Sequence, residues 1–169
     1  MADGAERSAE YARILEENRR YTAAFDRSAL TAAPLSGLAM LACMDARLDV
    51  EEVLGLRTGD AHIIRNAGGL ATDDAIRSII ISQQLLGTNE VIVIGHTGCG
   101  LLTADESGLR DRLTTETGQR LDIAFGSFTD LEASVRAQVE RLRSHPWVKR
   151  VPIHGLVFEV ESGRLYEVA

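Results

Sequence analysis

Hydrophobic residues along the chain fall into two kinds of segment. Continuous apolar runs occupy residues 37–43 and 91–94, and such runs are typical of strands that are buried on both faces. Residues 61–69 indicate a further strand that runs into a Gly-rich turn. Residues 72–87 and 130–145 instead place apolar residues at spacings of three and four, which predicts amphipathic helices. Because helical segments separate the strands, right-handed crossovers and a parallel sheet are favoured.

Local signals support the helices. Thr72 can cap the helix over 72–87, and the next two residues, Asp73 and Asp74, suit the positive end of its dipole. Gly87 can terminate this helix, and a short helical stretch at 50–56 ends near Gly55.

The C-terminal segment predicts an antiparallel pair. Residues 153–168 indicate a strand, a turn at Ser162-Gly163 and a closing strand. Residues 103–120 are polar and charged, and no structure is assigned to them. The predicted fold class is therefore three-layer α/β, with a mostly parallel central sheet of about four strands, an antiparallel C-terminal edge strand and helices on both faces.

Residues 5–28 predict an amphipathic helix at the N-terminus. Its largely apolar stripe should lie against the same domain or a partner subunit. We interpret residues 1–169 as a single domain in which residues 1–28 form an N-terminal helical arm. The stripe consists of Tyr11, Ile14, Leu15, Asn18, Tyr21 and Phe25.

Composition and charge argue against several classes of function. A net charge of −7 argues against a nucleic-acid binder, because phosphate backbones require basic patches. No segment reaches the ~20 apolar residues needed to span a bilayer, so no membrane partner is expected. The N-terminus lacks the apolar core of a secretory signal, and we expect a cytoplasmic protein. In such a reducing compartment the chain's two cysteines should not form a disulfide, which makes metal binding or reactivity more interesting.

Candidate chemistry lies in loops that follow the predicted strands. Open α/β sheets bind ligands at the carboxyl ends of their strands, and Cys43, His96 and Cys99 all fall at such ends. Two thiolates and an imidazole are suitable zinc ligands, and three protein ligands leave a fourth position open. Taken singly, each cysteine could equally be a core residue. Asp45 and Arg47 could be a solvated ion pair worth about 1 kcal/mol or less.

Together these residues resemble a known family. The pairing of C-x-D-x-R (Cys43, Asp45, Arg47) with H-x-x-C (His96, Cys99), some fifty residues later, is similar to the signature of the β-class carbonic anhydrases. The segment "GDAHIIRNAGG" at 59–69 also looks like the second-strand segment of that family. The short chain and its "CMDAR" resemble the compact bacterial type.

The resemblance implies a zinc lyase. One Zn²⁺ per chain would be bound by Cys43, His96 and Cys99, and zinc-bound hydroxide would convert CO₂ to bicarbonate and a proton. Asp45 would orient the hydroxide, and Arg47 would keep Asp45 ionised and off the metal. In some relatives the same aspartate becomes the fourth zinc ligand and closes the site.

The resemblance also implies an oligomer and further site features. Members are dimers or multiples of dimers, so a homodimer or homotetramer is expected, with the N-terminal helix extending to the partner. Arg65 matches an arginine that helps some relatives bind bicarbonate, but the tryptophan that accompanies it there is missing here. We therefore favour a bracing role for Arg65. His62, His145 and His154 lie outside the motif and are expected to be surface or packed residues.

Other functions remain open. The same site could hydrolyse carbonyl sulfide or carbon disulfide, since some proteins with this signature do so. A non-catalytic, regulatory zinc protein with the site closed by Asp45 is a second alternative, although structural zinc sites usually have four Cys and His ligands. A redox pair of Cys43 and Cys99 is a third, and it leaves His96 without a role.

Overall fold

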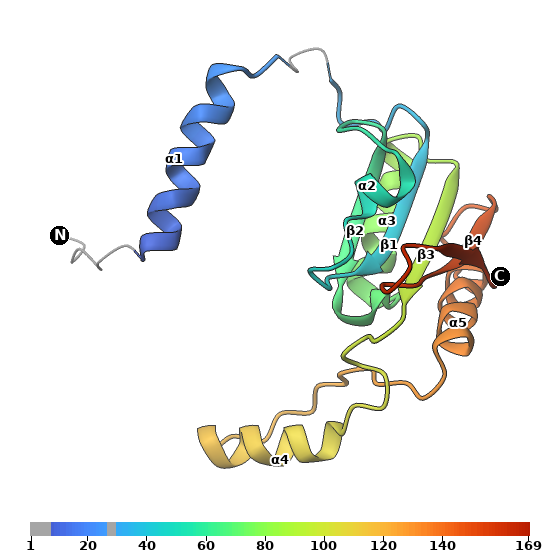
Figure 1. Cartoon of the computed structure of the whole chain (residues 1–169). Coiled ribbons are helices and arrows are strands. Elements are labelled where there is room, and N and C mark those ends of the chain that lie inside the picture. The colour runs from blue at the N-terminus through green and yellow to red at the C-terminus, as the bar shows by residue number, and fades with distance from the viewer. Residues whose placement is uncertain (1–7, 27–29) are drawn as a thin grey trace. The chain divides into compact units, whose positions relative to one another are not determined.

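The computed structural model describes residues 8–26 and 30–169 (Figure 1). These residues belong to two compact units, Met1–Leu30 and Thr31–Ala169. The first unit contains α1 (Ala9–Ala23), whose first turn is capped by the Ser8 hydroxyl. No side chain of α1 is buried.

The N-terminal helix is confirmed but is shorter than predicted. At the end of this helix the Ala24 N–H donates to the Tyr21 carbonyl, three residues back. This bond tightens the last turn, and the helix ends before residue 28. Residues 5–7 and 27–28 of the prediction lie outside the described residues.

The second unit is built on a five-stranded sheet with the order β2-β1-β3-β4-β5. The first four strands are parallel, and β5 pairs antiparallel with β4. This arrangement confirms the predicted α/β class with a mostly parallel sheet and an antiparallel edge. The strands are β1 (Leu38–Cys43), β2 (Ala61–Asn66), β3 (Glu90–His96), β4 (Ile153–Phe158) and β5 (Leu165–Glu167).

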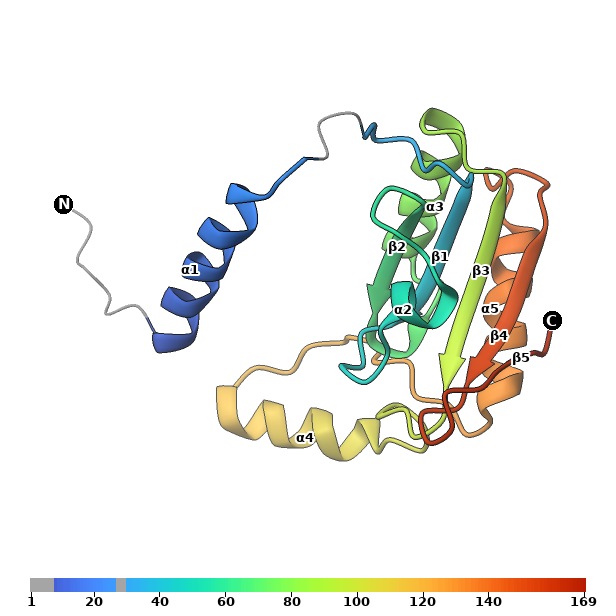
Figure 2. The same ribbon diagram turned by 45° about the horizontal axis from the view of Figure 1, so that its top comes forward.

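Helices cover both faces of the sheet (Figure 2). One face packs against α3 (Asp73–Leu85) and α5 (Leu131–Ser144), and the other against α2 (Val50–Leu54). Strand β1 shows why its sequence is continuously apolar: Leu41 joins the first core cluster, and Met40 joins the second.

The predicted caps are present. The Thr72 hydroxyl accepts the Ala75 N–H at 3.3 Å, and Gly55 closes α2 in the left-handed region with φ +66°. Helix α3 ends at Leu85, two residues before Gly87, which has φ +81°.

The β4–β5 connection, residues 159–164, is wider than the two-residue turn predicted at Ser162-Gly163. Glu159 organises it: its carbonyl accepts the Gly163 N–H at 2.8 Å, and its carboxylate accepts two bonds from the Arg164 guanidinium. These bonds close a loop rather than a tight hairpin turn.

The segment left unassigned contains a helix, α4 (Glu106–Thr117). The Asp105 carboxylate caps it by accepting the Gly108 N–H at 2.9 Å. It lies beyond the carboxyl ends of the strands (Figure 2), and none of its residues is buried. The sequence of this helix has no clear apolar period, so periodicity could not predict it.

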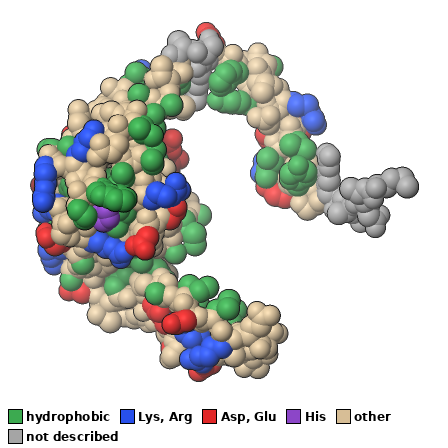
Figure 3. All heavy atoms as spheres, turned by 180° about the vertical axis from the view of Figure 1, so that it is seen from behind, with side chains coloured by type: hydrophobic (Ala, Val, Ile, Leu, Met, Phe, Trp, Pro, Cys, Tyr) green, Lys and Arg blue, Asp and Glu red, His purple; other side chains and the backbone are tan. Residues whose placement is uncertain are grey.

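Charged side chains of both signs are interspersed over the face shown in Figure 3. Among the described residues, no helix combines the length and apolar character needed to cross a membrane. The cytoplasmic location stays a prediction.

Strand β2 runs into the turn Ala67–Gly69, which passes very close to the ends of β1 and β3. Gly69 has φ +63°, and a Cβ atom there would lie 3.0 Å from the Ile94 carbonyl oxygen and 3.1 Å from the Cys43 nitrogen. Both neighbours are backbone atoms that cannot rotate away. Glycine is therefore required here by conformation and by space.

We expect Gly69→Ala to destabilise the protein more than Gly55→Ala. Both glycines have a left-handed conformation, which costs an alanine about 1 kcal/mol. Apart from the glycine's own chain neighbours and the adjoining helix backbone, no atom of the described residues lies within 4 Å of a Cβ at Gly55, whereas the crowding at Gly69 should add a further ~1–3 kcal/mol. Urea unfolding measures both losses, and equal losses would show that the close approach at Gly69 has no energetic weight.

Candidate metal centre

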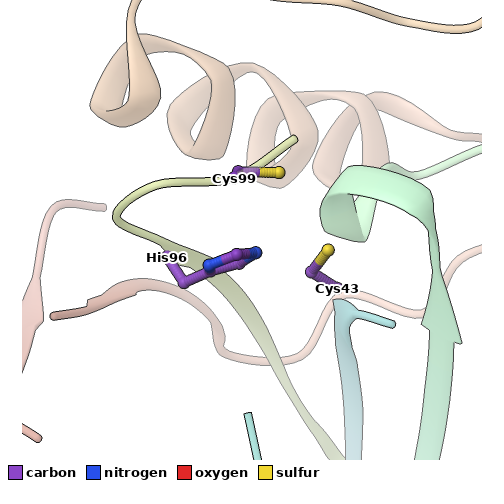
Figure 4. A group of neighbouring side chains, drawn as sticks. All are labelled: Cys43, His96 and Cys99. Carbon is purple, nitrogen blue, oxygen red and sulfur yellow. The ribbon is translucent and has the colours of Figure 1, made fainter. Parts of the chain in front are cut away.

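Three side chains with metal-binding chemistry meet at the carboxyl edge of the sheet (Figure 4). Cys43 is the last residue of β1, His96 is the last residue of β3, and Cys99 follows in the next turn. Because β1 and β3 are parallel neighbours, their ends lie side by side. The three ligand atoms lie within 4.8 Å of one another, and all three residues are buried.

The His96 ring is held in one orientation and one tautomer. Its Nδ1 lies 2.9 Å from the Thr97 carbonyl oxygen, which can only accept, so Nδ1 carries the proton. Nε2 is left with a free lone pair that faces the two sulfurs. This atom is buried and forms no hydrogen bond with any described residue, a costly arrangement unless a cation binds there.

The two cysteines are free thiols in a buried setting. Burial raises the pKa of Cys99, and the neighbouring Cys43 raises it further, although the Leu101 N–H partly offsets both effects. Two thiolates would therefore need a positive charge beside them. Two sulfurs and one imidazole nitrogen are a donor set that fits Zn²⁺.

Asp45 and Arg47 form a two-pronged ion pair next to these donors. The Arg47 Nε and Nη2 atoms donate to the two Asp45 oxygens at 2.9 and 2.8 Å, and the Arg47 backbone N–H adds a third bond at 2.9 Å. These bonds hold the pKa of Asp45 well below its usual range. Oδ2 of Asp45 lies 3.8 Å from Nε2 of His96, so an ionised carboxylate borders the donor set.

Two arginines fix the loops that carry these groups. Arg47 also donates to the Gly98 carbonyl at 3.0 Å, which ties the first loop to the turn before Cys99. Arg65 donates to the carbonyls of Cys43 at 2.9 Å and Asp45 at 2.7 Å. The bracing role predicted for Arg65 is thus the arrangement observed.

The remaining histidines lie outside the group of donors. Both ring nitrogens of His62 are engaged at 2.7 Å, by the Ser82 hydroxyl and the Ala32 carbonyl. His154 lies between two glutamates of neighbouring strands, and His145 accepts the Trp147 N–H. The prediction that these are packed or surface residues is confirmed.

Comparisons with known proteins identify the family. A family model described as carbonic anhydrase matches residues 38–122. β-Carbonic anhydrase 1 of Mycobacterium tuberculosis is 43% identical over 155 residues, which cover 91% of this chain and 94% of that protein. The chain belongs to the β-carbonic anhydrase family. This is a family of zinc lyases.

Two further proteins are similar to this chain in fold or in sequence. The crystal structure of a carbonic anhydrase from Streptococcus mutans has a TM-score of 0.90 and 37% identity, and covers 97% of this chain and 100% of that one. A carbon disulfide hydrolase of Acidithiobacillus thiooxidans is 40% identical over 145 residues, or 73% of each chain.

Sequence reasoning missed two residues beside the centre, Thr97 and Glu161. The Thr97 hydroxyl donates to the Glu161 carboxylate at 2.8 Å and accepts the Val160 N–H at 3.0 Å. Thr97 could have attracted notice only because it follows His96. Glu161 lies sixty-four residues after Thr97, in a polar turn that carries no motif.

We expect Arg65→Met to lower the free energy of unfolding by about 1–2 kcal/mol, because two backbone carbonyls lose a charged donor. Arg77→Met is the matched control: among the described residues Arg77 pairs only with exposed Asp74 one helical turn away, and its loss should cost less than about 0.5 kcal/mol. Urea unfolding of both variants tests this, and equal values would mean that Arg65 does not stabilise the loop.

Proposed function

We propose that this β-carbonic anhydrase binds one Zn²⁺ through Cys43, His96 and Cys99 and catalyses the reversible hydration of CO₂. The observation that carries the proposal is the buried, unpaired Nε2 of His96 beside two buried thiols. Three protein donors leave one coordination position for chemistry, which is typical of catalytic rather than structural zinc sites. When bound, zinc supplies Lewis-acid chemistry that turns water into a nucleophile near neutral pH.

Asp45 would orient the attacking water. Its carboxylate is ionised because Arg47 engages both oxygens, so it can accept a hydrogen bond from that water and direct a lone pair at the CO₂ carbon. One C–O bond forms, bicarbonate leaves, and a proton passes to solvent. His96 would contribute by position, since its Nδ1 bond fixes the ring and leaves Nε2 free to hold the metal.

Arg47 would also decide whether Asp45 can close the site. A carboxylate oxygen suits zinc, so Asp45 could become a fourth ligand if it left the arginine. In the structure both of its oxygens bind Arg47, an arrangement that supports the open state.

Carbon disulfide hydrolysis is the second candidate. It is favoured by the 40% identity to the carbon disulfide hydrolase of A. thiooxidans. Carbon disulfide, carbonyl sulfide and CO₂ are all linear molecules with an electrophilic carbon, so the same donors and the same Asp45 would serve all three. Rates with each substrate on one zinc-quantified preparation separate these activities.

We expect Asp45→Asn to retain zinc and to lower the CO₂ hydration rate by about 10²-fold, because the amide no longer holds the attacking water in line. The matched control is Asp73→Asn, since Asp73 is exposed and, within the described part of the chain, pairs only with Arg141, away from the centre. Stopped-flow hydration on metal-quantified protein measures both rates.

The other outcomes of that experiment are equally informative. An increase in rate on Asp45→Asn would show that Asp45 closes the site as a ligand. An unchanged rate would contradict any role for it. Wild-type protein without bound zinc would contradict the proposal itself.

We also propose that the chain forms a homodimer through α1. The apolar stripe of this helix is about half exposed in the single chain: 48% for Tyr11, 51% for Ile14, 48% for Tyr21 and 53% for Phe25. Exposed apolar faces of this kind mark subunit contacts.

We expect Ile14→Glu to shift the protein from dimer to monomer in light scattering, because a charge would enter the contact. Ala12→Glu adds the same charge away from the stripe and should leave the dimer intact. A dimer that persists in Ile14→Glu would exclude α1 as its interface.

A further inference from the structure

Thr97 joins the metal centre to the β4–β5 connection. Its backbone N–H donates to the Phe158 carbonyl at 3.0 Å. Its hydroxyl accepts the Val160 N–H at 3.0 Å and donates to Oε2 of Glu161 at 2.8 Å. Three hydrogen bonds thus fix one residue that lies between two of the proposed zinc ligands.

The remaining polar group of Thr97 acts on the centre itself. Its carbonyl accepts the Nδ1–H of His96 at 2.9 Å, and this bond sets the tautomer and the angle of the ring. A shift of Thr97 would therefore move this carbonyl and turn Nε2 away from the sulfurs.

We propose that Glu161 is a positioning residue of the metal centre, which acts through Thr97 on His96. The inference rests on the proposed function, because it assumes that Cys43, His96 and Cys99 hold the zinc. Glu161 touches neither the metal ligands nor the Asp45–Arg47 pair by any hydrogen bond among the described residues.

The charge on Glu161 strengthens this link. A hydroxyl that donates to a carboxylate makes a stronger bond than one to a neutral acceptor. The Thr97 hydroxyl lowers the pKa of Glu161, and the positive charge of Arg47 lowers it further, so the carboxylate is ionised at neutral pH.

The turn that carries Cys99 is therefore held from two directions. Arg47 holds the Gly98 carbonyl at 3.0 Å from the β1 side, and Glu161 holds the adjacent Thr97 from the β4–β5 connection. Loss of the hydrogen bond between Thr97 and Glu161 should leave the ligands in place but let the His96 ring move more freely.

Zinc release tests the inference directly. Zinc-loaded wild type, Glu161→Ala, Thr97→Val and the double variant are mixed with an excess of a chromogenic chelator at constant pH, and the release rate is followed. We expect release to be about 10-fold faster in each single variant, the usual size of an outer-shell effect. The double variant should release zinc no faster than Thr97→Val, because both changes break the same hydrogen bond between Thr97 and Glu161.

Two variants control for other effects. Thr97→Ser keeps the hydroxyl and should release zinc within about twofold of wild type. Glu159→Ala removes a different carboxylate of the same connection, one that binds Ser162 and Arg164 and not Thr97, and should also behave as wild type. The visible spectrum of the Co²⁺-substituted protein gives a second readout, which should change in Glu161→Ala and not in Glu159→Ala.

The results separate the two proposals. Wild-type protein that binds no zinc would overturn the proposed function. Stoichiometric zinc with an unchanged release rate in Glu161→Ala would overturn only the role of Glu161. Equal acceleration in Glu159→Ala and Glu161→Ala would also overturn it, since the connection would then act as a whole rather than through Thr97.

Discussion

The centre depends on an electrostatic constraint at the end of an apolar sheet. Two thiols and an imidazole nitrogen are buried together, and the nitrogen has no hydrogen-bond partner among the described residues. Burial opposes the charged form of the Cys99 thiol, while the His96 Nε2 atom loses the hydrogen bond it would have in water. A bound cation would offset both unfavourable contributions, so metal binding and the stability of this edge of the sheet are expected to be coupled.

The parallel sheet makes this arrangement possible at little local cost in free energy. Parallel strands bring their carboxyl ends to one edge, and the Gly69 turn lets the chain pass within contact distance of the ends of β1 and β3. The residues around the candidate metal ligands are polar. Arg47 and Arg65 bind backbone carbonyls and so hold the loops in place rather than the ligand side chains themselves. Ligand position is thus determined largely by backbone geometry.

Sequence patterns predicted most of the fold, and the reasons are physical. β1 and β3 are buried on both faces, and α3 and α5 each bury one stripe, so their hydrophobic periods are clear. The helix α4 has no buried residue and left no such period. The motifs also predicted that one site contains Cys43, Asp45, Arg47, His96 and Cys99. This prediction was possible because each motif follows the end of a strand, and strand ends can be recognised from local sequence. Thr97 and Glu161 were missed since their contact spans sixty-four residues and depends on how the β4–β5 connection folds back.

The hydrogen bond from His96 to the Thr97 carbonyl has an evolutionary consequence. Its acceptor belongs to the main chain, so no side-chain substitution at position 97 can remove the acceptor atom. Substitutions at position 97 or 161 can only loosen the loop by degrees. A histidine held by a side-chain acceptor would lose its orientation in one mutational step, whereas the orientation of His96 can change gradually while the tautomer stays the same.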